Sequence, residues 1–184
     1  MGKRLSESTG VDTSVEVFNN LALVERDSGK PEVALTTFLG ALKLSELIDP
    51  DEFDEEVASH HYGNIGRCLH LMGQIEPALV CYQKSAILLE KEQHSHSLMN
   101  QGYIRLWIGE LLVARKQYRV GLAFLRAAHG KWELIAPPKA LEIQKLICHV
   151  QKGELLESCN SPDDCESIVK NWSSGQSDSI ESFK

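Results

Sequence analysis

The 184-residue sequence lacks an apolar run long enough to cross a membrane, since a bilayer-spanning helix needs roughly 20 mostly apolar residues. Lys3 and Arg4 lie near the N-terminus, but no apolar segment follows them, so we expect no secretory signal peptide. The formal net charge of −7 disfavours a general nucleic-acid binder, which needs a basic surface. These absences predict a cytoplasmic protein that binds neither membranes nor nucleic acid.

The sequence also lacks the motifs of the common catalytic centres. It holds no GxSxG nucleophile elbow, no P-loop, no GxGxxG and no HExxH zinc motif. The pairs His60-His61 and His94-His96 have no carboxylate or cysteine at a matched spacing, so we expect solvated or capping histidines there rather than metal ligands. We therefore predict a protein that is not an enzyme and that needs no metal or cofactor.

Paired cysteine motifs are missing as well. The five cysteines contain no CxxC and are Cys68, Cys81, Cys148, Cys159 and Cys165. Three of them lie in apolar helical patterns, where cysteine behaves as a small hydrophobic residue. Reduced thiols in the cytosol are the simplest interpretation, and Cys159 would pair with Cys165 only if the C-terminal tail folded back.

What the sequence does contain is a repeat with a period of about 43 residues. Three rows share the spacings 12, 4 and 3, and each row has two small residues, then a large one, then a small one. The rows are Ala22, Ala34, Phe38 and Ala41; Gly66, Ala78, Tyr82 and Ser85; and Gly109, Gly121, Leu125 and Ala128. Two antiparallel helices approach closely only where both carry small side chains, and the large residue fills the groove beside that contact.

The second row lies in the clearest unit, which runs from Asn64-Ile65-Gly66 through Met72-Gly73 to Ala78-Leu79 and Tyr82-Gln83-Lys84-Ser85. This unit resembles the tetratricopeptide repeat (TPR), and the resemblance covers about residues 15–135. The period exceeds the usual length of roughly 34 residues, so the likeness is to the long-period type. The proline that often closes a TPR unit is absent after the second repeat.

The resemblance implies an all-α fold, an α-α superhelix of three helix-turn-helix repeats with a C-terminal capping helix. We expect a flexible segment over 1–13, a TPR domain over 14–152 and an acidic, Ser-rich tail over 153–184 with one short helix near 162–172. The repeats are expected at about 15–48, 59–93 and 102–135, with the capping helix at 139–152. The expected helices cover 14–28, 31–48, 51–72, 76–93, 96–115 and 117–135, and Asp49 and Pro50 are expected to start the third.

In a TPR array the first helix of each pair lines the concave groove, and the resemblance places Asn20, Asn64 and Trp107 there. It implies that Asn20 and Asn64 bond the backbone of an extended peptide, because an amide side chain both donates and accepts. The alternative is that each asparagine bonds a neighbouring helix. Arg67 on the same face would bind a carboxylate of the partner. His70 also lies on that face, where it contacts the partner or is simply solvated.

Repeat three has an apolar and aromatic inner face made by Tyr103, Leu106 and Trp107. Aromatic residues are frequent hot spots of binding surfaces, but the acidic tail or the capping helix would cover these three internally in the alternative interpretation. Trp132 is expected in the core against the capping helix. The basic groove residues of the chaperone-binding TPR subtype are absent from repeats one and three, so we reject that subtype.

We therefore expect a non-enzymatic adaptor or scaffold that binds a peptide segment of a partner protein in the TPR groove. The alternatives are a sensor for a short signalling peptide and a non-catalytic subunit of an enzyme complex. Residues 57–153 hold 12 bases and six acids, whereas residues 154–184 hold seven acids and two bases. This distribution favours an acidic partner with which the tail would compete. Three repeats also allow a homodimer through an exposed helix edge.

Overall fold

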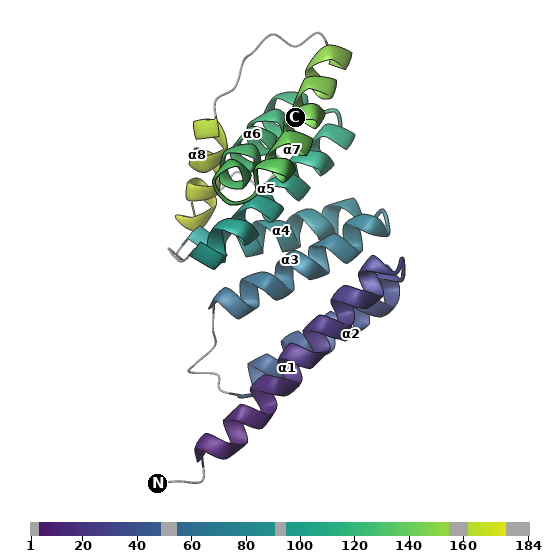
Figure 1. The fold of residues 1–184 in the computed structure, drawn as a ribbon, viewed down its shortest axis with the longest axis vertical. Helices are drawn as coiled ribbons and strands as arrows, with labels where there is room; N and C mark the ends of the chain where they lie inside the picture. Colours follow the sequence, from purple (N-terminus) through teal and green to yellow (C-terminus); the bar gives the residue numbers. More distant parts are fainter. Residues whose placement is uncertain (1–3, 49–54, 91–94, 155–161, 176–184) are drawn as a thin grey trace. The chain divides into compact units, whose positions relative to one another are not determined.

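The computed structural model of the chain describes residues 4–48, 55–90, 95–154 and 162–175. Eight helices and no strand occur in these residues (Figure 1). The helices are α1 (Arg4–Asp27), α2 (Pro31–Ile48), α3 (Glu55–Leu71), α4 (Ile75–Glu90), α5 (Ser95–Ala114), α6 (Tyr118–Ile135), α7 (Pro137–Glu154) and α8 (Pro162–Ser173). The chain divides into an N-terminal unit, Met1–Cys81, and a C-terminal unit, Tyr82–Lys184.

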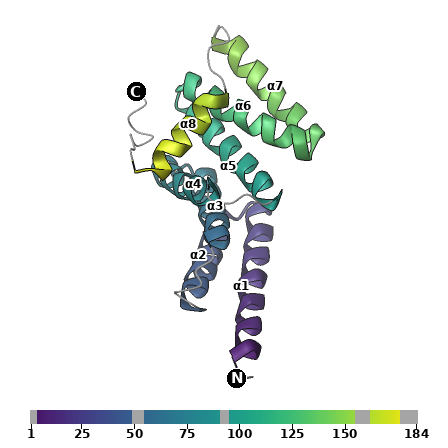
Figure 2. The ribbon, with the colours of Figure 1, turned by 90° about the vertical axis from the view of Figure 1, so that its left-hand side faces the viewer.

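The expected fold class is confirmed, because the described residues form an all-α structure of successive helical hairpins. In the N-terminal unit, α1 packs against α2, and α2 also packs against α3. In the C-terminal unit, α6 packs against α5, α7 and α8, and Figure 2 shows α8 beside α6. Consecutive helices in antiparallel pairs are the building blocks of an α-solenoid.

One helix begins well before its expected start, and the expected start of another cannot be compared. The first helix was expected at 14–28, but α1 begins at Arg4, so most of the segment expected to be flexible is helical. Residues 4–13 contain no proline, and nothing else in them stops the helix. The third helix, α3, begins at Glu55. Asp49 and Pro50, which were expected to start that helix, lie outside the described residues.

The C-terminal tail is not wholly separate from the repeats. Its expected short helix is present as α8, which buries the side chains of Cys165, Val169 and Trp172. This part of the tail therefore belongs to the packed C-terminal unit.

All twelve positions of the repeat pattern are buried. The small residues of each row, the large residue and the final small one all lie in the interior of the structure. Phe38, Tyr82 and Leu125, the large members of the three rows, are each fully inaccessible to solvent. The sequence pattern therefore marks the contact faces of the helices.

Two helices approach each other closely in the third repeat, where Gly109 of α5 faces Gly121 of α6. A Cβ atom built on Gly109 would lie 2.8 Å from the side chain of Leu125 and 3.1 Å from the carbonyl oxygen of Gly121. A Cβ atom on Gly121 would lie 2.9 Å from Val113 Cγ2 and 3.2 Å from the carbonyl oxygen of Gly109. A Cβ atom at either position would crowd both a side chain and the backbone of the facing helix, so glycine favours this close approach.

The three repeats turn in the same way. Gly29, Gly73 and Lys116 occupy equivalent positions after the first helix of each pair, and all have positive φ, at 78°, 74° and 62°. Each turn contains two characteristic backbone bonds, for example Gln117 N–H to Leu112 O at 2.9 Å and Lys116 N–H to Val113 O at 2.9 Å. This is the Schellman arrangement that closes a helix. The third repeat thus makes the glycine turn with a lysine.

Replacing Lys116 by glycine is expected to raise the free energy of unfolding of the C-terminal unit by about 1 kcal/mol. A side chain with a Cβ is strained at φ 62°, and the Lys116 side chain is exposed, so its removal costs few contacts. Chemical denaturation measures the change. The matched control is Gly73→Ala, which introduces the same strain at φ 74° and should lower stability by about 1 kcal/mol. A neutral or destabilising Lys116→Gly would contradict the interpretation.

Each unit has its own apolar core. In the N-terminal unit the buried cluster joins α1, α2 and α3 and contains Ala22, Ala34, Phe38, Leu42, Ile65 and Cys68. In the C-terminal unit the cluster joins α5, α6 and α7 and contains Leu106, Leu122, Leu125, Ala128, Trp132, Ala140, Ile143, Ile147 and Val150. The expectation that Trp132 packs in the core against the capping helix is confirmed, since α7 supplies the last four of these residues.

Candidate functional sites

Four of the predicted binding residues lie in the N-terminal unit. Asn20 is exposed on α1. Asn64 on α3 is half-buried, and its Oδ1 accepts a hydrogen bond of 2.9 Å from Arg26 Nη1 on α1. The acceptor side of Asn64 is therefore engaged within the chain, which is the second of the two roles expected for it. Asn20 keeps the exposure that contact with a peptide requires.

Arg67 and His70 lie together on α3, with Arg67 Nη1 3.3 Å from His70 Nδ1. Both side chains are half-buried. Burial, and next the charge of Arg67, lower the pKa of His70 to about 4, so the ring is neutral at physiological pH. Of these two residues, Arg67 therefore carries the positive charge.

The other three predicted residues lie on α5 in the C-terminal unit. Trp107 stacks on Tyr103 with ring centroids 5.2 Å apart and meets Tyr82 in a tilted contact at 5.8 Å. Tyr103 meets Trp132 edge to face at 4.7 Å. Tyr103 and Trp107 pack against the core cluster but remain partly exposed, whereas Leu106 is 5% exposed and belongs to that cluster. Leu106 is thus a core residue, and the aromatic pair alone offers surface.

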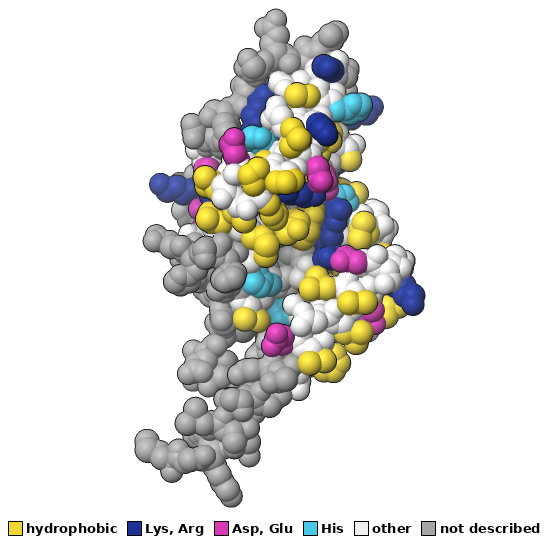
Figure 3. Space-filling model, viewed as in Figure 1, with side chains coloured by type: hydrophobic (Ala, Val, Ile, Leu, Met, Phe, Trp, Pro, Cys, Tyr) yellow, Lys and Arg dark blue, Asp and Glu magenta, His cyan; other side chains and the backbone are white. Residues whose placement is uncertain are grey.

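Exposed apolar side chains also occur on other elements, and Figure 3 shows apolar side chains at the surface interspersed with basic, acidic and histidine side chains. Four of them share the exposed side of α1: Val17, Phe18, Leu21 and Val24. Their spacing of three and four residues places three of them, Val17, Leu21 and Val24, in one stripe along the helix.

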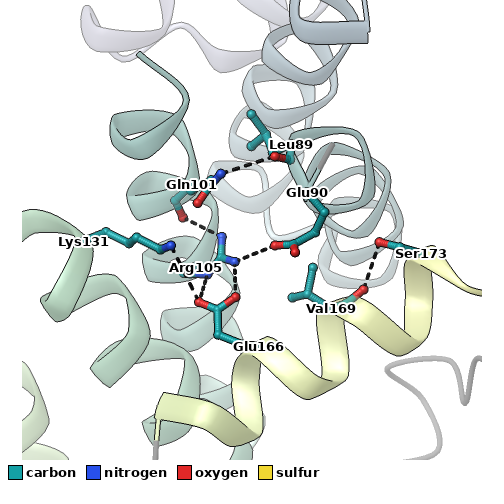
Figure 4. A network of polar contacts seen from close by, with 8 residues as sticks. All are labelled: Leu89, Glu90, Gln101, Arg105, Lys131, Glu166, Val169 and Ser173. Carbon is teal, nitrogen blue, oxygen red and sulfur yellow. Dashed lines mark hydrogen bonds and ion pairs between the residues drawn. The ribbon is translucent and has the colours of Figure 1, made fainter. Parts of the chain in front are cut away.

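Sequence reasoning missed a buried ion network centred on Arg105 of α5 (Figure 4). Arg105 is 1% exposed, and its Nε and Nη2 donate to the two carboxylate oxygens of Glu166 on α8 at 3.0 and 2.6 Å. Nη2 also donates to Glu90 of α4 at 2.9 Å, while Nη1 donates to the carbonyl oxygen of Gln101 at 3.4 Å. The Gln101 side chain in turn donates to the carbonyl oxygen of Leu89 at 3.2 Å.

The network keeps Arg105 charged although it is buried. Burial by itself lowers the pKa of the guanidinium. The hydrogen bond with Glu166 and the nearby negative charges raise it by more, so the pKa of Arg105 lies above its usual value. The two acidic side chains are only partly buried, with Glu90 28% and Glu166 40% exposed. Lys131 of α6 lies 4.0 Å from Glu166 as a second cation. The only sequence signal was a charged residue between Ile104 and Leu106 in an apolar helix.

His61 of α3 is a second buried polar group. It is 2% exposed, and its Nδ1 has no hydrogen-bond partner among the described residues. Burial, and next the charge of His60, lower the pKa of His61 to about 4. The expectation that the His60-His61 pair is solvated or capping is thus wrong for His61, because its ring lies in the interior.

The N-terminal unit is expected to lose about 2 kcal/mol of stability through His61 when the pH falls from 7.5 to 5. The unfolded histidine binds a proton below about pH 6.5, whereas the folded one resists protonation until about pH 4, so the stability is present above pH 6.5 and is lost as the pH falls toward 4. Urea denaturation at both pH values measures it. His61→Leu should remove that part of the pH dependence, and His149→Leu, at an exposed position of α7, should leave it unchanged. An unchanged slope in His61→Leu would contradict the assignment.

The described residues hold no group of three or more His, Cys, Asp or Glu that is arranged to bind a metal ion. No disulfide bond joins the cysteines among those residues, and Cys159 lies outside them. None of the helices described by the structure combines the length and the apolar character of a membrane span.

Comparison of the chain with known protein families, with curated proteins and with solved structures gave no significant match. Support for the repeated helical hairpins comes from the structure itself, together with the burial of the repeat positions.

Proposed function

We propose that the chain is a TPR-type interaction module, a non-enzymatic adaptor that binds a peptide segment of a partner protein. The observation that carries the proposal is the burial of all twelve positions of the 12-4-3 pattern. Those positions build the scaffold of helical hairpins, and such scaffolds present the remaining faces of their helices to partners.

The binding residues that remain accessible are Asn20 and Arg67 in the N-terminal unit and Tyr103 and Trp107 in the C-terminal unit. The N-terminal unit would supply an amide and a cation, which suit an acidic peptide segment. The C-terminal unit would supply aromatic surface, which suits an apolar one. Asn64 would donate a hydrogen bond to the peptide with its amide nitrogen, because its oxygen accepts from Arg26.

We place the module in the cytoplasm, where its cysteines would stay reduced. The exposed α1 stripe of Val17, Leu21 and Val24 would form the contact with a second copy of the chain in a homodimer.

Affinity purification from the native cell followed by mass spectrometry tests this proposal. We expect one stoichiometric protein partner whose capture is lost, or weakened at least about tenfold, in the double variant Asn20→Ala, Trp107→Ala, since hot-spot aromatics commonly contribute more than 1.4 kcal/mol. Thr36→Ala, at an exposed position of α2, is the control that should leave capture unchanged. Undiminished capture by the double variant would reject these residues. Thermal stabilisation by a short peptide alone would favour a peptide sensor instead.

A further inference from the structure

The helix α8 is seated on the C-terminal unit by one face. Its buried residues Cys165, Val169 and Trp172 are spaced by four and three, which places them along a single stripe. Trp172 stacks on Phe124 of α6 with ring centroids 5.9 Å apart. On the other sides of the last turn of α8, Lys170, Asn171 and Ser173 are exposed. The contact therefore has the form of an amphipathic helix laid into a receiving surface.

Two pairs of contacts give the direction of α8. Phe124 of α6 meets Trp172, whereas Lys131, two turns further along α6, meets Glu166. The partners on α8 thus run in the opposite order, so α8 lies antiparallel to α6. Ala127 and Ala128 lie between Phe124 and Lys131 in the sequence of α6, and both are buried. Small residues at this point permit close approach of a second helix.

Arg105 gives the surface a fixed polar anchor. Arg105 donates two parallel hydrogen bonds to the carboxylate of Glu166. This bidentate geometry favours a carboxylate over other acceptors. Glu90 and the carbonyl oxygen of Gln101 hold the other side of the guanidinium and do not belong to α8. Arg105 would therefore keep a counter-charge and its orientation if α8 departed. The carboxylate site is built by α4 and α5 independently of its present occupant.

The features that hold α8 favour selectivity over strength. The helix α8 has 12 residues. Isolated helices of up to roughly 12–15 residues are only marginally stable in water, so α8 depends on its packing against the C-terminal unit to stay helical. A buried Arg–Glu pair seldom adds net stability compared with apolar residues of similar volume, but it fixes which helix binds and in which register. The carboxylate of Glu166 is also 40% exposed.

We propose that the surface of α4, α5 and α6 beneath α8 is a docking site for an amphipathic helix of a partner protein, and that α8 is the chain's own competing occupant. The partner helix would carry a carboxylate to bind Arg105 and apolar side chains at −1, +3 and +6 from it, the last one aromatic. Cys165, Val169 and Trp172 hold these places relative to Glu166. The site uses none of the residues assigned above to peptide binding, so either proposal can fail alone.

A synthetic fluorescein-labelled peptide of residues 162–174 tests the proposal by fluorescence anisotropy. The full-length variant Glu166→Ala, Trp172→Ala releases α8, and it should bind this peptide at least about tenfold more tightly than the wild type, whose site is occupied. The same peptide with Glu166→Gln and Trp172→Ala should not bind. Equal binding to the wild type and the variant, or no binding to a variant whose circular dichroism shows native helix content, would overturn the proposal.

Thiol labelling of the wild-type protein tests the opening of α8 without any variant. Cys165 and Cys68 are both fully buried, and burial raises the pKa of Cys165 to about 12 and of Cys68 to about 11, so both react slowly in the closed state. If α8 opens locally, maleimide labelling resolved by mass spectrometry should modify Cys165 at least about tenfold faster than Cys68. Labelling of Cys165 no faster than the global unfolding of the C-terminal unit, measured by denaturation, would show that α8 leaves only on global unfolding and would overturn the proposal. Light scattering tests a further outcome. If the wild-type protein is a dimer and Trp172→Ala makes it a monomer, the helix that docks is the α8 of a second copy and not a partner protein's helix.

Discussion

Replacing Gly121 by alanine is expected to lower the free energy of unfolding of the C-terminal unit by about 2 kcal/mol, although alanine is the better helix former. The new methyl group would lie 2.9 Å from Val113 Cγ2, 3.1 Å from the backbone nitrogen of Val113 and 3.2 Å from the carbonyl oxygen of Gly109. Two of these three atoms are backbone, so the clash cannot be relieved by a rotamer change. The helices α5 and α6 would have to separate, and the contacts of the buried Leu125 would weaken with them.

The control for this prediction lies in the same helix. A Cβ atom on Gly130 would meet no atom within 4 Å, and the position is exposed. Gly130→Ala should therefore raise the free energy of unfolding by about 1 kcal/mol through helix propensity alone. Urea denaturation of both variants gives the two values, and changes of the same sign would show that the glycine contact does not limit the approach of α5 and α6.

The repeat framework was predictable because its cause is local and periodic. Close helix pairs need small residues at fixed spacings, so the twelve positions could be read from the sequence, and the structure buries all of them. The turn after α5 was less obvious, since Lys116 stands where the other repeats have glycine. The start of α1 could not be placed, because residues 4–13 are polar and have no apolar period to mark a helix.

The site around Arg105 was not predictable, because its partners are distant in the sequence. Glu166 is 61 residues away, and in the charge pattern Arg105 was one of many bases in the middle of the chain while Glu166 was one of many acids in the tail. The pattern indicated attraction between the two segments, and the structure shows such a pair. Which base meets which acid depends on how α8 packs on α6, and spacing alone does not contain that information.

Replacing Arg105 by alanine is expected to destabilise the C-terminal unit by about 3 kcal/mol, the lower end of the cost of breaking a buried ion pair, because Glu90 and Glu166 are partly exposed. The change leaves the carboxylates of Glu90 and Glu166 facing one another without their shared cation, and it empties the volume of a side chain that is 1% exposed. Lys139→Ala is the control, since its ion pair with Glu142 at 2.9 Å joins side chains that are 36% and 66% exposed. Its loss should cost no more than about 0.5 kcal/mol. Chemical denaturation compares the two, and a similar small cost for both would contradict the assignment.

A triple variant separates the stability of this network from its selectivity. If Arg105→Met is combined with Glu90→Leu and Glu166→Leu, no charge is left buried, and apolar side chains of similar volume fill the space. We expect this variant to recover most of the stability that Arg105→Ala loses, because desolvation of Arg105 offsets much of its attraction to the carboxylates. The same variant should hold α8 without discriminating for a carboxylate, so a competing helix with Glu166→Gln should bind as well as one with glutamate. If the triple variant were instead as unstable as Arg105→Ala, the ion network would be a net source of stability. Selection of the docking helix would then need another explanation.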